Sequence, residues 1–151
     1  RTAAARADFE RAIRRDPQCA EAHAWRGGML RAQGKPAAAI KSLDAALRLD
    51  SICAWAFGWR GEAKMFQGRL NDALADFDRA LGIYPDYSDG RAWRAETLRR
   101  LGRDAEALAD FAESIRLAPE QIRAYLGRGL LLKKLGDDAA ALADLRRAGA
   151  G

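Results

Sequence analysis

The sequence is poor in the residue types that build metal sites, and it lacks long apolar runs. Its 151 residues include one His and two Cys, whereas a structural zinc site takes four nitrogen or sulfur ligands. No segment approaches the roughly 20 consecutive apolar residues that a membrane-spanning helix needs. The stretch RTAAARADFERAIRR at the N-terminus has no apolar core between its charges, so no signal peptide is visible. We therefore expect no metal, no cofactor and no membrane insertion.

The sequence also lacks a large excess of one charge and any recognisable catalytic motif. There are 26 Lys and Arg against 21 Asp and Glu, a formal net charge of +5. A positive excess attracts polyanions without specificity, but here it is small and both signs are interleaved, which disfavours nucleic-acid binding. His23 has no Ser or Cys nucleophile motif and no glycine-rich phosphate loop to work with. We expect no enzymatic activity.

What the sequence does contain is an internal repeat of 34 residues. Residues 20–53, 54–87, 88–121 and 122–151 align without a gap. In each block the fifteenth residue is Gly and the twentieth is Ala: Gly34, Gly68, Gly102 and Gly136, then Ala39, Ala73, Ala107 and Ala141. Apolar residues in 71–83 recur with a 3.6-residue period, which predicts an amphipathic helix, and Gly suits a helix C-terminus that turns left-handed. Each block is predicted to form two helices joined by a short turn.

This pattern resembles the tetratricopeptide repeat (TPR) family, which has Gly at position eight, Ala at twenty, Phe at twenty-four and Pro at thirty-two. The resemblance covers essentially the whole chain, because residues 1–19 fit as the second helix of a further repeat. It implies an all-α, right-handed superhelical solenoid of antiparallel helix pairs. We expect a single domain over residues 1–151 with about four and a half repeats.

The main departure from the family pattern is a charged residue at position seven, which is normally aliphatic. All four units carry Arg there: Arg26, Arg60, Arg94 and Arg128. A charge facing a helix interface must be paired, because burying it alone is costly. The expected partners are the acids at position twenty-three, with Ser42 in place of one of them: Asp8, Asp76, Asp110 and Asp144. We interpret these pairs as structural, with ligand contact as the alternative.

The resemblance implies that the first helices line a concave groove through positions two, five, six, nine, twelve and thirteen. Position six holds Trp25, Trp59 and Trp93, and Trp55 occupies position two. Such indoles would offer rigid contact area to a peptide. They could instead pack against neighbouring first helices, and the sequence leaves both interpretations open.

Charged residues flank these tryptophans at positions nine, twelve and thirteen. They are Glu62, Glu96, Arg31, Arg99, Arg100, Lys133 and Lys134. The cations complement the dipole at the C-terminal ends of their helices, or they hold acidic groups of a bound segment. The Lys and Asn pattern by which the chaperone-binding branch of the family clamps a carboxylate is absent.

The two cysteines occupy the same position in adjacent units. Neighbouring helices lie about 8 to 10 Å apart, which exceeds the roughly 7 Å limit for a disulfide. We therefore expect Cys19 and Cys53 to be free thiols, which fits a reducing compartment and a cytoplasmic location.

We interpret the chain as a non-catalytic interaction module that binds a peptide segment or protein partner in its groove. The alternative is an architectural or docking region of a larger multidomain enzyme, such as a glycosyltransferase or a signalling protein, with no ligand in the groove. Both ends of the sequence look cut within the repeat pattern. We expect either a longer parent protein, or self-association or packing on further domains through the uncapped ends near Leu142 and Leu145.

Overall fold

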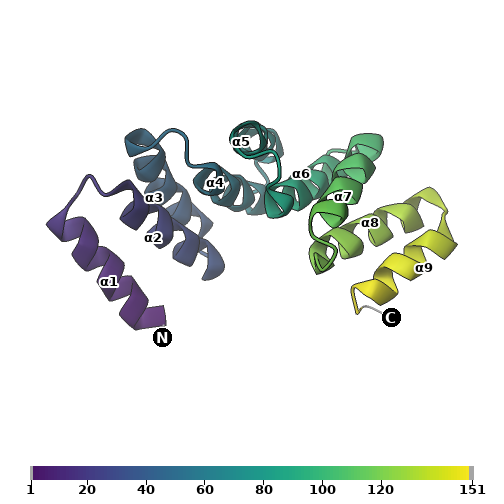
Figure 1. Cartoon of the computed structure of the whole chain (residues 1–151), viewed down its shortest axis with the longest axis horizontal. Coiled ribbons are helices and arrows are strands. Elements are labelled where there is room, and N and C mark those ends of the chain that lie inside the picture. The colour runs from purple at the N-terminus through teal and green to yellow at the C-terminus, as the bar shows by residue number, and fades with distance from the viewer. Residues whose placement is uncertain (1, 150–151) are drawn as a thin grey trace. The chain divides into compact units, whose positions relative to one another are not determined.

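The computed structural model describes residues 2–149, so residue 1 and residues 150–151 of the predicted domain lie outside it. The described part contains nine α-helices and no strand, which confirms the all-α prediction (Figure 1). None of these helices is both long and apolar enough to cross a bilayer. The helices are α1 (Thr2–Arg15), α2 (Ala20–Ala32), α3 (Pro36–Leu49), α4 (Ala54–Phe66), α5 (Leu70–Ile83), α6 (Ser88–Arg100), α7 (Asp104–Leu117), α8 (Ile122–Leu135) and α9 (Asp138–Arg147).

The repeat register is visible in where the helices begin and turn. The first helices start at the first residue of each 34-residue block, namely Ala20, Ala54, Ser88 and Ile122. The glycine at position fifteen follows each first helix with a positive φ, from +69° at Gly34 to +88° at Gly136. A side chain at that φ meets its own backbone, so glycine is the residue that lets the chain reverse within a few residues.

The chain divides into two compact units, Arg1–Ile83 and Tyr84–Gly151, which we describe separately. In the first unit, α2 pairs with α3 and α4 pairs with α5, while α3 packs on α4 and α2 lies against α4. Helix α1 packs on α2. In the second unit, α6 pairs with α7 and α8 with α9, α7 packs on α8, and α6 lies against α8. Each helix therefore buries itself mainly against helices that are near in sequence.

Close helix contact depends on small residues opposite large ones. A Cβ on Gly27 would lie 2.5 Å from Leu43 Cγ, and one on Gly61 would lie 2.9 Å from the Phe77 ring. In the second unit a Cβ on Gly127 would lie 2.4 Å from the Phe111 ring. Because both Phe rings are fully buried, a glycine on the facing helix is what makes room for each of them.

The Arg residues at position seven form ion pairs and hydrogen bonds inside their own repeats. Arg60 donates to both carboxylate oxygens of Asp76, at 2.9 Å and 2.7 Å, and Arg94 and Arg128 pair in the same way with Asp110 and Asp144, 16 residues further on. Where the acid is replaced, Arg26 donates to Ser42 Oγ at 2.8 Å. Arg60 also reaches Asp44 of the preceding repeat at 2.7 Å. These Arg residues thus fasten the two helices of a repeat to each other.

Replacing Asp76 with Asn tests how strongly the first unit depends on its ion pair. Asp76 is buried and also accepts from Lys64 Nζ at 2.7 Å. Burial opposes the charge on Arg60, but its hydrogen bonds to Asp76 and Asp44 outweigh that cost and raise the pKa of Arg60. Asp76→Asn removes the buried carboxylate that Arg60 and Lys64 share and leaves Arg60 with Asp44 alone, and we expect a loss of about 3 kcal/mol in the free energy of unfolding by urea.

Asp72→Asn is the matched control, because Asp72, in the first turn of the same helix, forms an exposed pair with Arg69, which directly precedes that helix. Its loss should stay below about 1 kcal/mol. Equal losses for the two variants would show that the buried ion pair contributes no more to the free energy of unfolding than the exposed one.

Candidate interaction surface

Three of the predicted site residues form one aromatic cluster in the first unit. Trp25 of α2 lies with its ring centroid 5.4 Å from Trp55 and 5.4 Å from Trp59, and the two indoles of α4 are 4.7 Å apart. The rings meet in tilted and edge-to-face arrangements, which suit the quadrupoles of aromatic rings. Trp25 remains 45% exposed, while Trp55 and Trp59 are half-buried. We call these three residues the indole surface.

Within the indole surface, packing and exposure are divided between different rings. A Cβ on Gly28 would lie 2.5 Å from the Trp59 ring, so this indole fills the space that a side chain on α2 would take. Trp25 Nε1 donates to Glu21 Oε1 at 3.3 Å, one turn earlier in the same helix. Trp59 thus packs between α2 and α4. The Trp25 ring is exposed to solvent, and its contacts with Glu21, Trp55 and Trp59 fix its orientation.

Two predicted charged residues, Arg31 and Glu62, lie beside the indole surface. They form an ion pair between α2 and α4, and the Arg31 guanidinium lies 5.6 Å from the centroid of the Trp59 ring. Glu62 is buried, so it acts as the counter-ion that keeps Arg31 in place rather than as a contact for solvent. Arg31 is the accessible member of the pair.

A pocket of about 470 Å³ opens next to this ion pair. Phe66, at the end of α4, lines this pocket and is 59% exposed. The sequence did not single out Phe66 or Pro36 as site residues, although Phe66 stands at position thirteen, where later units carry Arg100 and Lys134. We call this the Arg31 pocket; it is lined by Arg31, Ala32, Gly34, Pro36, Glu62, Ala63 and Phe66.

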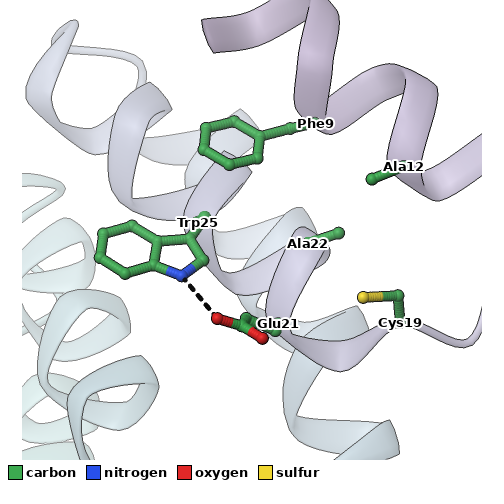
Figure 2. A pocket seen from close by; sticks show the side chains of 6 residues that line it. All are labelled: Phe9, Ala12, Cys19, Glu21, Ala22 and Trp25. Carbon is green, nitrogen blue, oxygen red and sulfur yellow. Dashed lines mark hydrogen bonds between the residues drawn. The ribbon is translucent and has the colours of Figure 1, made fainter.

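A second pocket, of about 510 Å³, lies between α1 and α2 (Figure 2). Its lining is mostly apolar, with the Glu21 carboxylate as the charged exception, and Figure 2 shows Phe9 and Trp25 on one side of it and Cys19 at the other. Sequence reasoning did not predict this pocket, because no single helix contains it. It is lined by Phe9, Ala12, Cys19, Glu21, Ala22 and Trp25.

In the second unit most of the predicted site residues are engaged with side chains of the same unit. The Arg123 guanidinium lies over the half-buried Trp93 ring, 3.8 Å from its centroid. Arg99 and Arg100 both donate to Glu96, at 2.8 Å each. Lys134 pairs with Asp104 at 2.7 Å, while Lys133 is exposed. Of the predicted basic residues in this unit, Arg99, Arg100 and Lys134 are therefore already paired with acidic side chains of the same unit.

Across residues 2–149 no three His, Cys, Asp or Glu side chains lie close enough to hold a metal ion together. What the first unit offers is an exposed indole, a cation held beside it and two pockets, of which the one between α1 and α2 is the more apolar.

Replacing Gly28 with Ala tests the contact between α2 and the indole surface. The new methyl group overlaps the Trp59 ring, so the indole has to move, and we expect a shift in tryptophan emission with a loss of about 1 kcal/mol in unfolding free energy. Gly82→Ala in α5 is the control, because its Cβ meets nothing within 4 Å. Ala should there stabilise the helix by up to about 1 kcal/mol without changing the emission. Identical behaviour of the two variants would refute the contact.

Replacing Glu96 with Gln tests the pH dependence of the second unit. Burial disfavours the charged carboxylate, but hydrogen bonds from Arg99 and Arg100 outweigh it and hold the pKa of Glu96 below its usual value. A pKa that is lower in the folded state contributes stability above the unfolded pKa of about 4.3, and this contribution is lost as the pH falls through the folded pKa. Urea midpoints should therefore fall more steeply between about pH 5 and pH 3 in the unmodified chain than in Glu96→Gln. The exposed Glu120→Gln should keep the original slope, and equal slopes for all three would contradict the assignment.

Comparison with known proteins gives consistent results for family and fold. The family model for the tetratricopeptide repeat matches residues 1–51 and 60–122, and a second tetratricopeptide repeat model matches residues 122–148. A search among curated proteins finds no matching relative.

Several solved structures share the fold over most of the chain. MamA is 24% identical, with a TM-score of 0.80 over 93% of this chain and 82% of that chain. Pseudomonas aeruginosa pilF is 25% identical, with a TM-score of 0.85 over 99% of this chain and 69% of that chain. YrrB, described as a TPR protein with an unusual peptide-binding site, is 22% identical, with a TM-score of 0.74 over 97% and 76%. With the repeat register, the helix pairs and the family models in agreement, this chain belongs to the tetratricopeptide repeat family.

Proposed function

We propose that the chain is a non-catalytic protein-interaction module, and that α2 and α4 of its first unit bind a peptide segment of a protein partner. The observation that carries the proposal is the exposed Trp25 ring, held in place by two further indoles and lying on the same helix as Arg31. A large side chain that is already ordered before binding loses little entropy when a ligand covers it. Trp and Arg are also the residues most enriched where binding energy concentrates.

The chemistry of the surface favours a segment with an apolar or aromatic residue for Trp25 and a second apolar residue for the Arg31 pocket. Phe66 and Pro36 supply the apolar walls of that pocket, and Arg31 adds donors at its edge. YrrB, which shares the fold, is described as having a peptide-binding site, and this supports an interaction role for the present chain.

A second candidate function, an architectural region without a groove ligand, is favoured by the second unit. There Arg123 covers Trp93, and Glu96 holds Arg99 and Arg100. A ring face that is covered and charges that are already paired leave fewer groups free to contact a ligand. We therefore assign peptide binding to the first unit and a chiefly structural role to Trp93, Glu96, Arg99 and Arg100.

Peptide selection on the purified chain tests the proposed function. A phage-displayed library of random peptides is panned on the chain, and the affinities of enriched peptides are measured by calorimetry. Trp25→Ser and Phe66→Ser should each weaken these peptides by about tenfold or more, as for truncation of a binding hot spot. Trp93→Ser should leave the affinities unchanged.

Leu49→Ser is the matched control, because Leu49 is 42% exposed at the end of α3, close to the 45% of Trp25. It should leave the affinities unchanged while removing an apolar side chain of similar fractional exposure. Failure to enrich any peptide, or equal losses for Trp25→Ser and Leu49→Ser, would favour the architectural function instead.

A further inference from the structure

The Arg31 pocket of the first unit has a counterpart in the second unit that is closed by an ion pair. Phe66 and Pro36, two apolar walls of the pocket, correspond to Lys134 and Asp104 two repeats further on. In the second unit these two positions meet directly, because Lys134 Nζ lies 2.7 Å from Asp104 Oδ2. In the first unit the same positions hold apolar side chains that border a pocket of about 470 Å³. The first unit therefore has an apolar site where the second unit has a completed contact.

Among the described residues that line this pocket, Arg31 is the only cation, and its guanidinium is less fully hydrogen-bonded than that of its counterpart. The counterpart is Arg99, whose Nε and Nη2 both donate to Glu96, at 2.8 Å and 2.9 Å. Arg31 has Gly28 at the position of Glu96 and so lacks this acceptor. Its Nη1 donates to Glu62, and its buried Nε has no acceptor among the residues that the structure describes. Because an unpaired buried donor is unfavourable, an acceptor that a ligand brings into the pocket is favoured.

The charge balance of the pocket favours a neutral acceptor over a carboxylate. Glu62 is buried and already neutralises Arg31. A ligand carboxylate beside Arg31 would also lie near Glu62, and like charges placed together in an interface are unfavourable. A peptide carbonyl oxygen accepts the same hydrogen bond without adding a charge. The expected ligand group is therefore a backbone carbonyl next to an apolar side chain.

The lining of the pocket suits a residue that has no backbone N–H. Glu62 is the one acceptor side chain among the described lining residues, and it is buried and engaged with Arg31. Proline supplies a carbonyl and an apolar ring but no backbone N–H. Proline-rich segments form a polyproline II helix whose carbonyls have no internal partners. Such segments are ordered before they bind, and they bind where aromatic rings line a groove, as the 59% exposed Phe66 does here.

We propose that the Arg31 pocket binds a proline residue of a polyproline II segment in the partner protein. The proline ring packs against Phe66 and Pro36, and a backbone carbonyl of the segment accepts from Arg31. The inference rests on the proposed function, because it specifies the kind of peptide segment that α2 and α4 bind.

A peptide of about ten prolines with both ends blocked is the probe, because it forms the polyproline II helix and carries no charged group. Binding to the full chain is followed by proton–nitrogen correlation NMR of the arginine Nε–H groups. The Arg31 signal is assigned from its absence in Arg31→Lys. Addition of the probe should shift the Arg31 signal, because its guanidinium gains an acceptor. The Arg99 signal should stay in place, because Glu96 already accepts from its Nε.

Two variants separate the carbonyl contact from the ring contact, with affinities measured by fluorescence polarisation of the labelled probe. Arg31→Lys keeps a cation beside Glu62 but removes the guanidinium donors, and it should weaken the probe by about fivefold, as for loss of a hydrogen bond. Phe66→Ser should weaken the probe by about tenfold, as for truncation of a binding hot spot. Arg99→Lys is the matched control, because Arg99 holds the same repeat position in the second unit, and it should leave the affinity unchanged.

Changes in the ligand test the features that proline supplies. Peptides enriched in the random selection should contain proline, and replacing that proline with alanine restores a backbone N–H and removes the ring. This replacement should weaken binding by about tenfold. A free carboxylate at the C-terminus of the proline probe should leave its affinity unchanged, because the pocket takes a neutral carbonyl.

Opposite results overturn the proline assignment. No binding of the probe, an unmoved Arg31 signal, or equal affinities for Phe66→Ser and the unmodified chain would show that the pocket takes no proline. Binding of the free acid about tenfold more tightly than the blocked probe would assign the pocket to a C-terminal carboxylate instead.

The proposed function and the proline assignment fail in different ways. Enriched peptides that depend on Trp25 and Phe66 but contain no proline would keep the proposed function and reject the proline assignment. Binding of the proline probe through Arg31, together with a selection that enriches no peptide dependent on Trp25, would keep the proline site and reject the role of Trp25.

Discussion

The structure depends on helices that approach each other closely where one of them has no side chain. Gly27 faces Leu43, Gly28 faces Trp59 and Gly61 faces Phe77. Each contact removes a large apolar group from water at a helix spacing that a longer side chain would prevent. Because position eight is small in every repeat, as Gly27, Gly61, Ala95 and Gly129, a close helix contact is built again in each one, and no helix has to find a partner that is far away in sequence.

Hydrogen bonds and ion pairs are added to this packing at position seven, the main departure from the family pattern. An Arg replaces the usual aliphatic residue at position seven, and the buried acid 16 residues later satisfies it, as in Arg60 and Asp76. A buried ion pair contributes little net stability compared with an apolar pair of the same volume. It does, however, penalise any register in which the Arg and the acid are not opposite each other.

The indole surface combines a ring that packs between helices with a ring that is exposed to solvent. One edge of the Trp59 ring packs against Gly28, and this contact fixes the orientation of the indole that Trp25 contacts. Glu62 is buried beneath Arg31 and so keeps a cation beside the aromatic rings. The alternative between packing and ligand contact that the sequence left open is therefore not exclusive: the inner indole packs, and the outer one is left with an ordered face.

The sequence by itself determined the repeat length, the all-α class and the family, because helical periodicity, the turn glycines and the recurring alanines are local signals that each unit repeats. It also indicated the tryptophans and the Arg residues, since both recur at one repeat position. Only the tertiary structure decided which indole is exposed, that Glu62 is a buried counter-ion, and that pockets lie beside Phe66 and between α1 and α2. Those properties belong to pairs of helices, and a side chain's exposure is determined by whatever the facing helix places against it.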